Sequence, residues 1–315
     1  MGTGPFAVPS FEALRAGGYE IALVVTKPTP PVKSRKGPPP NPVRQWADDH
    51  GLPVFDPASI NEPDAIENAI QQHADLMVVC DYGHILKPAA LAAARLGGIN
   101  LHGSLLPAYR GAAPVQRALL SGDKVTGVSV IHMTPRLDGG PILATAETAI
   151  RDDETAGELE ERLSDIGVTS TIQAVEMLVN WDGESNIGEQ QNPDLVTKAP
   201  RLSKAEGMVD WTQSYTEISC HVRGMQPWPI AFTHLQLDTV KQPIRLAIKK
   251  IACADIDPGS SQPGEVVAGD GFFVAVADGV VQIMRLQPAG KREMDAIEFL
   301  RGHKIPAGTP LGLTD

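Results

Sequence analysis

The sequence predicts an α/β fold in which a doubly wound, mostly parallel sheet is followed by a small β-barrel or sandwich. In the first two-thirds of the chain, apolar runs of strand length alternate with segments of helical periodicity, as in sheets covered by helices on both faces. A polar stretch interrupts this pattern. Beyond it, short apolar strands separated by turns predominate. We expect an α/β domain at 1–182, a linker at 183–200 and a β-rich domain at 201–315.

Periodicity and capping residues predict the elements of the first domain. The run Leu76–Cys80 is wholly apolar, as in parallel strands covered on both faces. Thr155 and Glu158 have the spacing of a capping box, so a helix should begin there. Further strands are expected at 21–25, 53–55, 99–102 and 126–132, and helices at 43–50, 62–72 and 114–120, with one beginning near Ser10 and one ending at Arg95.

The second domain is expected to begin with a helix and continue mainly as strands. Ser214 and Glu217 have capping-box spacing before a helical pattern. A strand is expected at 244–251, a hairpin from 272–277 and 281–286 that closes at Asp278-Gly279, and a last helix at 294–300.

The first residues, Gly2–Ala7, have the G-x-G-x-x-A spacing of a dinucleotide-binding fingerprint. That fingerprint needs a strand before it and an acidic residue at the end of the second strand, where this chain has Lys27. We therefore expect no nicotinamide cofactor. Since the first strand of a doubly wound sheet is central, its absence would leave two neighbours with unpaired edges. Our hypothesis is that Met1 is an internal methionine and that the natural chain starts several residues earlier.

Composition restricts the class of protein. The net charge of −11 is not that of a nucleic-acid-binding protein as a whole. No segment is apolar for long enough to span a bilayer, and no export signal is evident. Three dispersed cysteines, Cys80, Cys220 and Cys253, indicate reduced thiols in a cytosolic protein, and no metal-ligand cluster is found.

One segment is locally basic. Residues 27–44 contain no acidic residue and are rich in proline, so they should form an exposed, extended arm. Its basic residues are Lys27, Lys33, Arg35, Lys36 and Arg44. Such an arm is either a solvated linker or a contact to a phosphate backbone.

The candidate chemistry is concentrated around Asn100 and His102. Residues i and i+2 of a strand point to the same face, so both side chains should enter a cleft at the carboxyl end of their strand. Taken alone, such a pair could simply close a turn. Asp138, which follows another predicted strand, is the third group, because an acid there can orient an imidazole. The turn from Asp81 to Leu86 should border the same cleft.

Three motifs resemble the 10-formyltetrahydrofolate-dependent formyltransferases: Asn100–Pro107, Arg110–Pro114 and Leu137–Gly140. The carboxyl-terminal motifs are similar to the branch that acts on methionyl-tRNA, and they are Pro227–Pro229, Leu286–Met294 and Phe299–Gly302. The resemblance implies a Rossmann-like catalytic domain and an OB-like barrel that helps to hold the initiator tRNA. It implies formyl transfer from 10-formyltetrahydrofolate to the α-amino group of methionyl-initiator tRNA. We further expect a cytoplasmic monomer that uses no metal and binds no membrane.

The resemblance also implies roles for individual residues. The catalytic set is Asn100, His102 and Asp138. The folate site comprises Ser104, Leu105, Leu106, Pro107, Tyr82, Gly83, Ile85 and Leu86. The tRNA contacts are Lys27, Lys33, Arg35, Lys36, Arg44, Lys291 and Arg292. The arm departs from the family pattern at Thr29–Ser34, where relatives have more arginine and glycine, so its hold on tRNA should be differently placed.

Other functions remain open at this point. Within enzymes, they are formyl transfer to an amino sugar or a purine precursor, and hydrolysis of the formylfolate. The basic arm and the separate barrel argue against these, since a small acceptor needs neither. A non-enzymatic alternative is an RNA-binding module on an inactive transferase scaffold, and the intact catalytic set argues against it.

Overall fold

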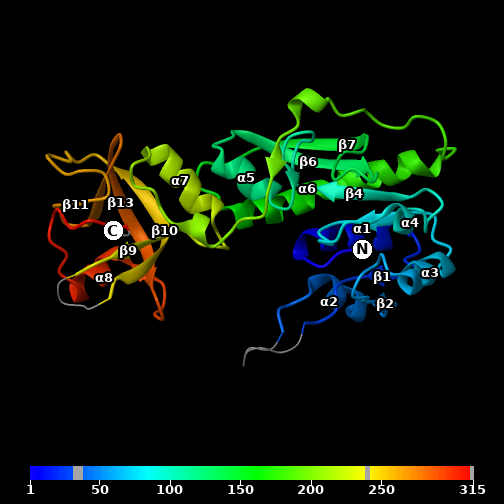
Figure 1. Ribbon diagram of the computed structural model, residues 1–315, viewed down its shortest axis with the longest axis horizontal. Coiled ribbons are helices and arrows are strands. Elements are labelled where there is room, and N and C mark those ends of the chain that lie inside the picture. The colour runs from blue at the N-terminus through cyan, green and yellow to red at the C-terminus, as the bar shows by residue number, and fades with distance from the viewer. Residues whose placement is uncertain (31–37, 238–241, 313–315) are drawn as a thin grey trace. The chain divides into compact units, whose positions relative to one another are not determined.

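The computed structural model describes residues 1–30, 38–237 and 242–312. By its contacts the chain divides into two compact units (Figure 1). The first unit comprises residues 1–115, 125–149 and 159–200, and the second comprises residues 116–124, 150–158 and 201–315. Residues 183–200, which the sequence suggested as a linker, therefore pack within the first unit.

The first unit contains a two-stranded parallel sheet and a mixed four-stranded sheet. Strands β1 (Val24–Val25) and β2 (Val54–Phe55) pair in parallel, as do β3 (Met77–Val79) and β4 (Gly98–His102). Strands β6 (Val125–His132) and β7 (Ile142–Ala149) continue from β4 in antiparallel pairing, in the order β3-β4-β6-β7. The predicted α/β fold with a parallel sheet is thus confirmed. The sequence did not suggest β7, because one of its faces is solvated and its apolar pattern is weak.

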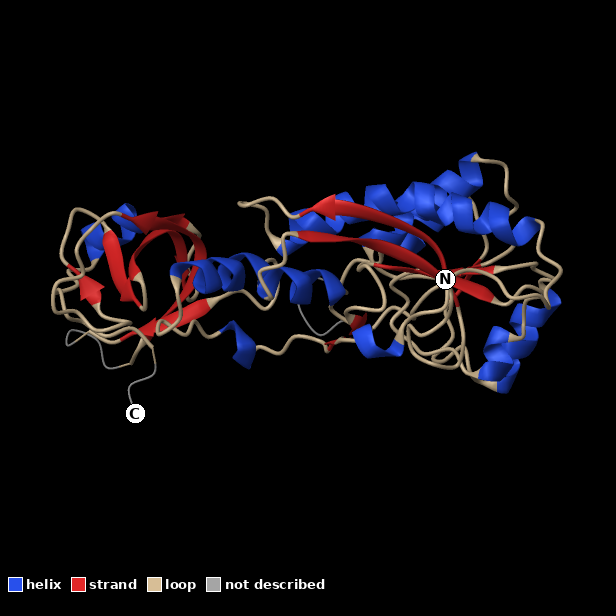
Figure 2. Ribbon diagram, turned by 90° about the horizontal axis from the view of Figure 1, so that it is seen from above, coloured by secondary structure: helices blue, strands red, loops and turns tan. Residues whose placement is uncertain are grey.

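Helices pack around the strands of the first unit. They are α1 (Val8–Ala16), α2 (Pro42–Asp49), α3 (Pro63–Gln71), α4 (Pro88–Leu91) and most of α6 (Ala156–Val179), whereas α5 (Pro114–Leu120) belongs mostly to the second unit. Figure 2 shows α6 running along the long antiparallel strands. A Cβ at Gly167 of α6 would lie 2.8 Å from the side chain of Leu101 in β4, so helix and strand approach closely only because residue 167 is glycine. The predicted capping box at Thr155 is confirmed by hydrogen bonds in both directions with Glu158.

Met1 and Gly2 lie between β1 and β3. The amino group of Met1 donates to the carbonyl oxygen of Val78 at 2.7 Å, and its carbonyl accepts from Cys80 at 3.0 Å. The amide of Gly2 donates to the carbonyl oxygen of Val25 at 3.0 Å. Met1 and Gly2 therefore lie where a central strand would run between β1 and β3, but they hydrogen-bond only near Val25, Val78 and Cys80.

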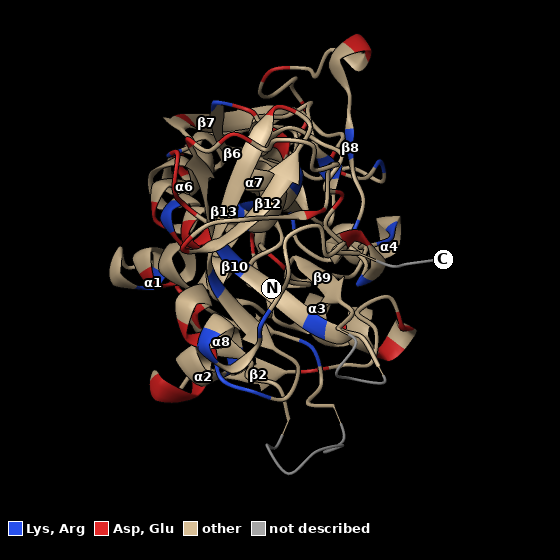
Figure 3. Ribbon diagram, turned by 90° about the vertical axis from the view of Figure 1, so that its left-hand side faces the viewer, with Lys and Arg blue, Asp and Glu red and all other residues tan. Residues whose placement is uncertain are grey.

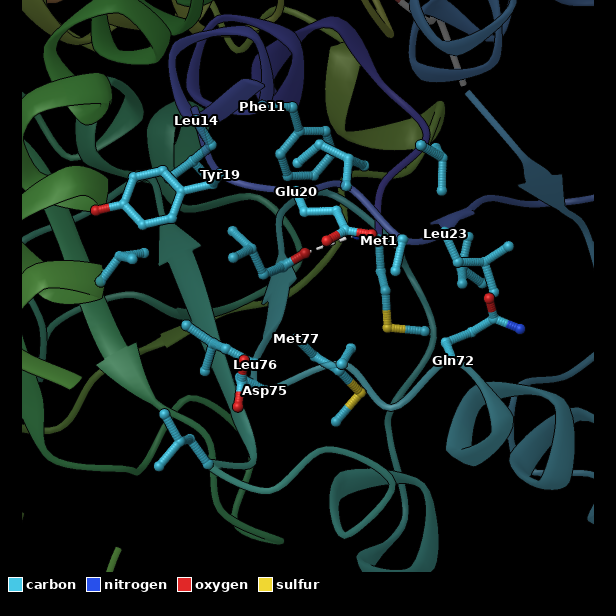
Figure 4. A pocket seen from close by; sticks show the side chains of 18 of the residues that line it. Met1, Phe11, Leu14, Tyr19, Glu20, Leu23, Gln72, Asp75, Leu76 and Met77 are labelled. Atoms are coloured by element: carbon cyan, nitrogen blue, oxygen red, sulfur yellow. Dashed lines mark hydrogen bonds between the residues drawn. The ribbon is translucent and has the colours of Figure 1, made fainter. Parts of the chain in front are cut away.

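Beside Met1 is a cavity of about 380 Å³ (Figure 4). Phe11 and Leu14 of α1 line it, together with the chain segments that enter β1 and β3. The strand expected at 21–25 is formed only at Val24–Val25, because the backbone of residues 21–23 borders this space with no strand beside it.

The second unit is a curled antiparallel sheet, which confirms the predicted barrel-like domain. Its strands are β9 (Phe232–Leu235), β10 (Ile244–Ala254), β11 (Val266–Val267), β12 (Phe272–Val276), β13 (Gly279–Pro288) and β14 (Met294–Asp295). Their order is β11-β12-β13-β10-β9, with β14 beside β13. The helices after residue 200 are α7 (Tyr215–Gly224) and α8 (Ala296–Gly302). The predicted hairpin closes with Val276 opposite Gly279, and the predicted capping box of Ser214 and Glu217 is present.

Short 3₁₀ turns and one further strand pair complete the chain. The turns are at Pro5–Ala7, Pro193–Leu195 and Ala205–Gly207, and the strands are β5 (Arg110–Gly111) and β8 (Lys198–Ala199). Among the described residues, no helix combines the length and the apolar character needed to cross a membrane.

Candidate active site

His102 ends β4, and its imidazole is held in one orientation. The side chain is 7% exposed, and Nε2 lies 2.9 Å from the carbonyl oxygen of Tyr109. Because a carbonyl oxygen only accepts hydrogen bonds, Nε2 carries a proton, and in the neutral ring the lone pair is on Nδ1. Nδ1 lies 4.0 Å from Oδ2 of Asp138. The structure therefore brings the predicted imidazole and carboxylate together, with the unprotonated nitrogen facing the acid.

Asp138 lies in the turn between β6 and β7, and this turn has a constrained backbone. Its φ is +47°, in the left-handed region, and its Oδ2 accepts from the amide of Gly111 at 2.9 Å. A Cβ at Gly140 would overlap the carbonyl oxygen of His132, so only glycine fits this position. The turn thus presents the carboxylate, which is 11% exposed, toward His102.

Asn100 shares the face of β4 with His102, two residues earlier. The strand register places Asn100 opposite Ile131 and His102 opposite Ser129. Asn100 is half-buried, and its side-chain amide makes no hydrogen bond to another residue in the described part of the chain. This amide is therefore able to donate to a bound ligand.

The predicted folate segment Ser104–Pro107 is fixed to β6. The hydroxyl of Ser129 donates to the carbonyl oxygen of Ser104 at 2.8 Å and accepts from the amide of Leu106 at 3.0 Å. The Ser104 hydroxyl donates to the carbonyl oxygen of Ala108 at 2.7 Å and so closes its own turn. Leu106 is buried and joined to Pro107 by a cis peptide, whereas Leu105 and Pro107 are half-buried.

The second predicted folate segment, Tyr82–Leu86, is only partly exposed. Tyr82 and Leu86 are 2% and 3% exposed and pack in the core beside β1 and β3. Burial raises the pKa of the Tyr82 hydroxyl. Gly83 has φ +70°, and Ile85 is 63% exposed. Of the four predicted folate residues in this segment, Gly83 and Ile85 are exposed and able to contact a ligand, whereas Tyr82 and Leu86 are buried.

The predicted tRNA contacts are dispersed. Lys33, Arg35 and Lys36 lie outside the described residues. Lys27 lies against Gly83, and Arg44 forms an ion pair with Asp56. Lys291 and Arg292 are exposed, and Arg292 pairs with Glu298 at 2.5 Å. Figure 3 shows further Lys and Arg positions, coloured blue, on β10 and α8 of the second unit.

Sequence reasoning missed the residues that frame the site from the segment 183–200. Thr197 Oγ1 accepts from the amide of Tyr109 at 2.8 Å, and β8 pairs in parallel with β5. Gln191 bonds to Arg110 and to the turn that carries Asp138. Residues 183–200 are polar and have no apolar periodicity, so the sequence pattern does not predict these contacts. Within residues 1–30, 38–237 and 242–312, no three His, Cys, Asp or Glu side chains are grouped as metal ligands would be.

Comparisons with known proteins agree across the chain. Residues 1–175 match the family Formyl transferase, and residues 201–304 match Formyl transferase, C-terminal domain. The methionyl-tRNA formyltransferase of Rhodopirellula baltica is 60% identical over 99% of this chain and 95% of its own length. That of Methylococcus capsulatus is 40% identical over 99% of this chain and 98% of its own length.

A solved structure shares the fold. It is the crystal structure of an N-formyltransferase from Helicobacter canadensis in complex with folinic acid and dTDP-3-aminofucose, with a TM-score of 0.62 at 16% identity. The likeness covers 91% of this chain and 97% of that one. The matched families and the full-length relatives together show that this chain belongs to the methionyl-tRNA formyltransferase family.

Proposed function

We propose that this chain transfers the formyl group of 10-formyltetrahydrofolate to the α-amino group of methionyl-initiator tRNA. The observation that carries the chemistry is the orientation of His102. Its Nε2–H donates a hydrogen bond to the carbonyl oxygen of Tyr109, so the Nδ1 lone pair is available beside the carboxylate of Asp138. The acceptor is supported by the full-length relatives, which are named methionyl-tRNA formyltransferases.

The reaction needs proton transfer more than activation of the nucleophile. A free α-amino group has a pKa of about 7.7 to 8.0, and an ester neighbour lowers it, so much of it is neutral at pH 7. The amine attacks the formyl carbon and forms a C–N bond. The carbonyl π electrons then move onto the oxygen, to which the amide of Asn100 donates a hydrogen bond, an interaction of roughly 2.7 to 4 kcal/mol in the transition state.

His102 then moves the proton. Nδ1 accepts it from the new ammonium, and the imidazolium lies beside the negative charge of Asp138. The oxyanion collapses, the bond from the formyl carbon to the folate nitrogen breaks, and His102 returns the proton to that nitrogen. General acid–base catalysis of this kind contributes about 10² to 10⁴ in rate.

We assign the two substrates to different surfaces. The folate is proposed to bind at Ser104–Pro107 and along the exposed part of Tyr82–Leu86. The tRNA is proposed to contact the arm that begins at Lys27 and the pair Lys291 and Arg292, since phosphate contacts need exposed basic side chains. Because its substrate is a charged tRNA, we expect the enzyme to act in the cytoplasm, and we expect it to be a monomer.

The test is an assay of the purified chain with 10-formyltetrahydrofolate and three acceptors. Formylation of initiator methionyl-tRNA, with much slower formylation of elongator methionyl-tRNA and none of a nucleotide amino sugar, is the expected result. Release of free formate without an acceptor would instead identify a hydrolase. Binding of tRNA with no turnover would identify an inactive scaffold.

A further inference from the structure

Gln191 is joined to the active site by four hydrogen bonds from one side chain. Its Oε1 accepts from Nε of Arg110 at 3.1 Å and from Nη2 at 2.5 Å. Its Nε2 donates to the carbonyl oxygens of Asp138 at 2.8 Å and Gly140 at 2.7 Å. An amide side chain has two acceptor and two donor positions, so Gln191 uses its full capacity here.

Both groups that Gln191 holds need an external support. Asp138 has φ +47°, a conformation that non-glycine residues adopt only where the surroundings impose it. Arg110 is 8% exposed, and its burial and the neighbouring Arg136 lower the pKa of its guanidinium, against the opposing effect of Asp138. The guanidinium therefore needs acceptors, and Gln191 supplies one on the side of the Asp138 turn.

We propose that Gln191 is a positioning residue of this site, which fixes the Asp138 turn and so keeps the carboxylate beside His102. It touches neither the imidazole nor any reacting atom in this arrangement. Its effect passes through the backbone of Asp138 and Gly140, because its side-chain amide, which is not part of the turn, donates hydrogen bonds to their carbonyl oxygens. The effect on turnover rests on the proposed function, whereas the effect on His102 geometry does not.

Two substitutions distinguish the hydrogen bonds that Gln191 accepts from Arg110 from those that it donates to the Asp138 turn. Gln191→Glu keeps the acceptor for Arg110 and strengthens it by charge, but it removes both donors to the turn. Gln191→Leu removes all four hydrogen bonds at similar size. Gln71 on α3 provides the matched control, since among the described residues its side chain makes a single hydrogen bond, a long, exposed contact to Glu67 at 3.4 Å. Gln71→Glu and Gln71→Leu should behave as the unmodified chain.

The first measurement needs no turnover. Imidazole nitrogen chemical shifts of His102 in the folded, substrate-free protein report the surroundings of Nδ1. Both Gln191 variants should shift the Nδ1 signal, while the Nε2 proton stays hydrogen-bonded to Tyr109. Unchanged signals in both variants would overturn the proposal, whatever reaction the protein catalyses.

The second measurement is the split between kcat and KM. We expect both Gln191 variants to lower kcat at least tenfold, with KM for the folate within about twofold of the unmodified value and a displaced midpoint in the pH profile of kcat. Activity retained in Gln191→Glu but lost in Gln191→Leu would assign the role to Arg110 instead and overturn the proposal. If the unmodified chain itself shows no formyl transfer, the proposed function fails, and the chemical shifts alone decide the role of Gln191.

Discussion

Oδ2 of Asp138 faces Nδ1 of His102 at 4.0 Å, which is longer than a direct hydrogen bond. The imidazole is instead oriented by the Tyr109 carbonyl on its other nitrogen. In the proposed mechanism, Asp138 therefore acts mainly through its charge, which would stabilise an imidazolium at His102 during turnover. The first prediction follows from these two separate roles, orientation of the ring by the Tyr109 carbonyl and charge stabilisation by the Asp138 carboxylate.

Asp138→Asn should keep the bond from Gly111, because an amide oxygen also accepts, but it removes the charge. We expect kcat to fall by up to about 10⁴, the most that general acid–base catalysis usually supplies, with folate binding unchanged. Steady-state kinetics and folate titration measure the two effects. Asp165→Asn, at an exposed position on α6, is the control. Equal losses of kcat and folate affinity would indicate a structural role for Asp138.

Gly140→Ala should displace the Asp138 turn, since its Cβ would overlap the carbonyl of His132. Core overpacking usually costs about 1 to 3 kcal/mol, so we expect a lower free energy of unfolding together with lower kcat. Chemical denaturation and activity assays provide the measurements. Gly302→Ala is matched to it, because a Cβ there meets nothing within 4 Å. A variant at residue 140 as stable as the one at 302 would contradict the prediction.

Lys27→Met should raise the pKa of His84. Burial lowers this pKa first, and the positive charge of Lys27 lowers it further. Removing the charge leaves only the effect of burial, so the pKa moves back toward its ordinary value. An NMR titration of the His84 ring measures the change. No movement would mean that Lys27 does not occupy its place beside Gly83 in solution.

In a chain that begins at Met1, the amino group of Met1 should make stability depend on pH. Burial lowers its pKa from 8.0 to about 5. Between these values the unfolded chain binds more protons than the folded one, so the free energy of unfolding should rise as the pH rises from 5 to 8. Thermal unfolding across this range, compared with a chain carrying an N-terminal extension that moves the charge away, measures this contribution.

The cavity beside Met1 predicts which extension stabilises the protein. An extension of Val-Ile-Val-Ile-Val could lie alongside residues 21–23, which form no strand in the structure, and fill the mainly apolar space. We expect Tm to rise by about 2 to 4 °C for each kcal/mol gained. Gly-Ser-Gly-Ser-Gly, of equal length, moves the charge but fills nothing. Equal Tm values for the two extensions would contradict the prediction.

The paired substitution Lys291→Ala and Arg292→Ala should weaken tRNA binding in a salt-dependent way. Each lost phosphate contact lowers the slope of log affinity against log salt by about 1. Filter binding at several salt concentrations measures the slope. Arg95→Ala, which removes an exposed charge paired with Asp75 in the first unit, is the control. An unchanged slope would remove this pair from the tRNA surface.

The features that could be predicted from the sequence are those that depend on local residue pattern. The spacing of Asn100 and His102, the two capping boxes and the hairpin at Asp278 follow from periodicity and short-range geometry, and the structure has them. Asp138 was found because an acid followed by two glycines comes after a strand. Tyr109, Gln191 and Thr197 were not found, because their roles arise from pairing between segments far apart in the chain. The buried side chain of Tyr82 was likewise not evident, since burial depends on tertiary packing.

The way the chain is shared between its two units limits how it can be divided. The backbone passes from one unit to the other after residues 115, 124, 149, 158 and 200. A fragment cut at 182 would lose β8, Thr197 and Gln191, while a fragment that starts at 201 would lack two stretches that pack with it. A chimaera made from two relatives with a single crossover would therefore combine segments from both parents within one compact unit. Chimaeras of this protein need several junctions, placed so that each unit comes from one parent.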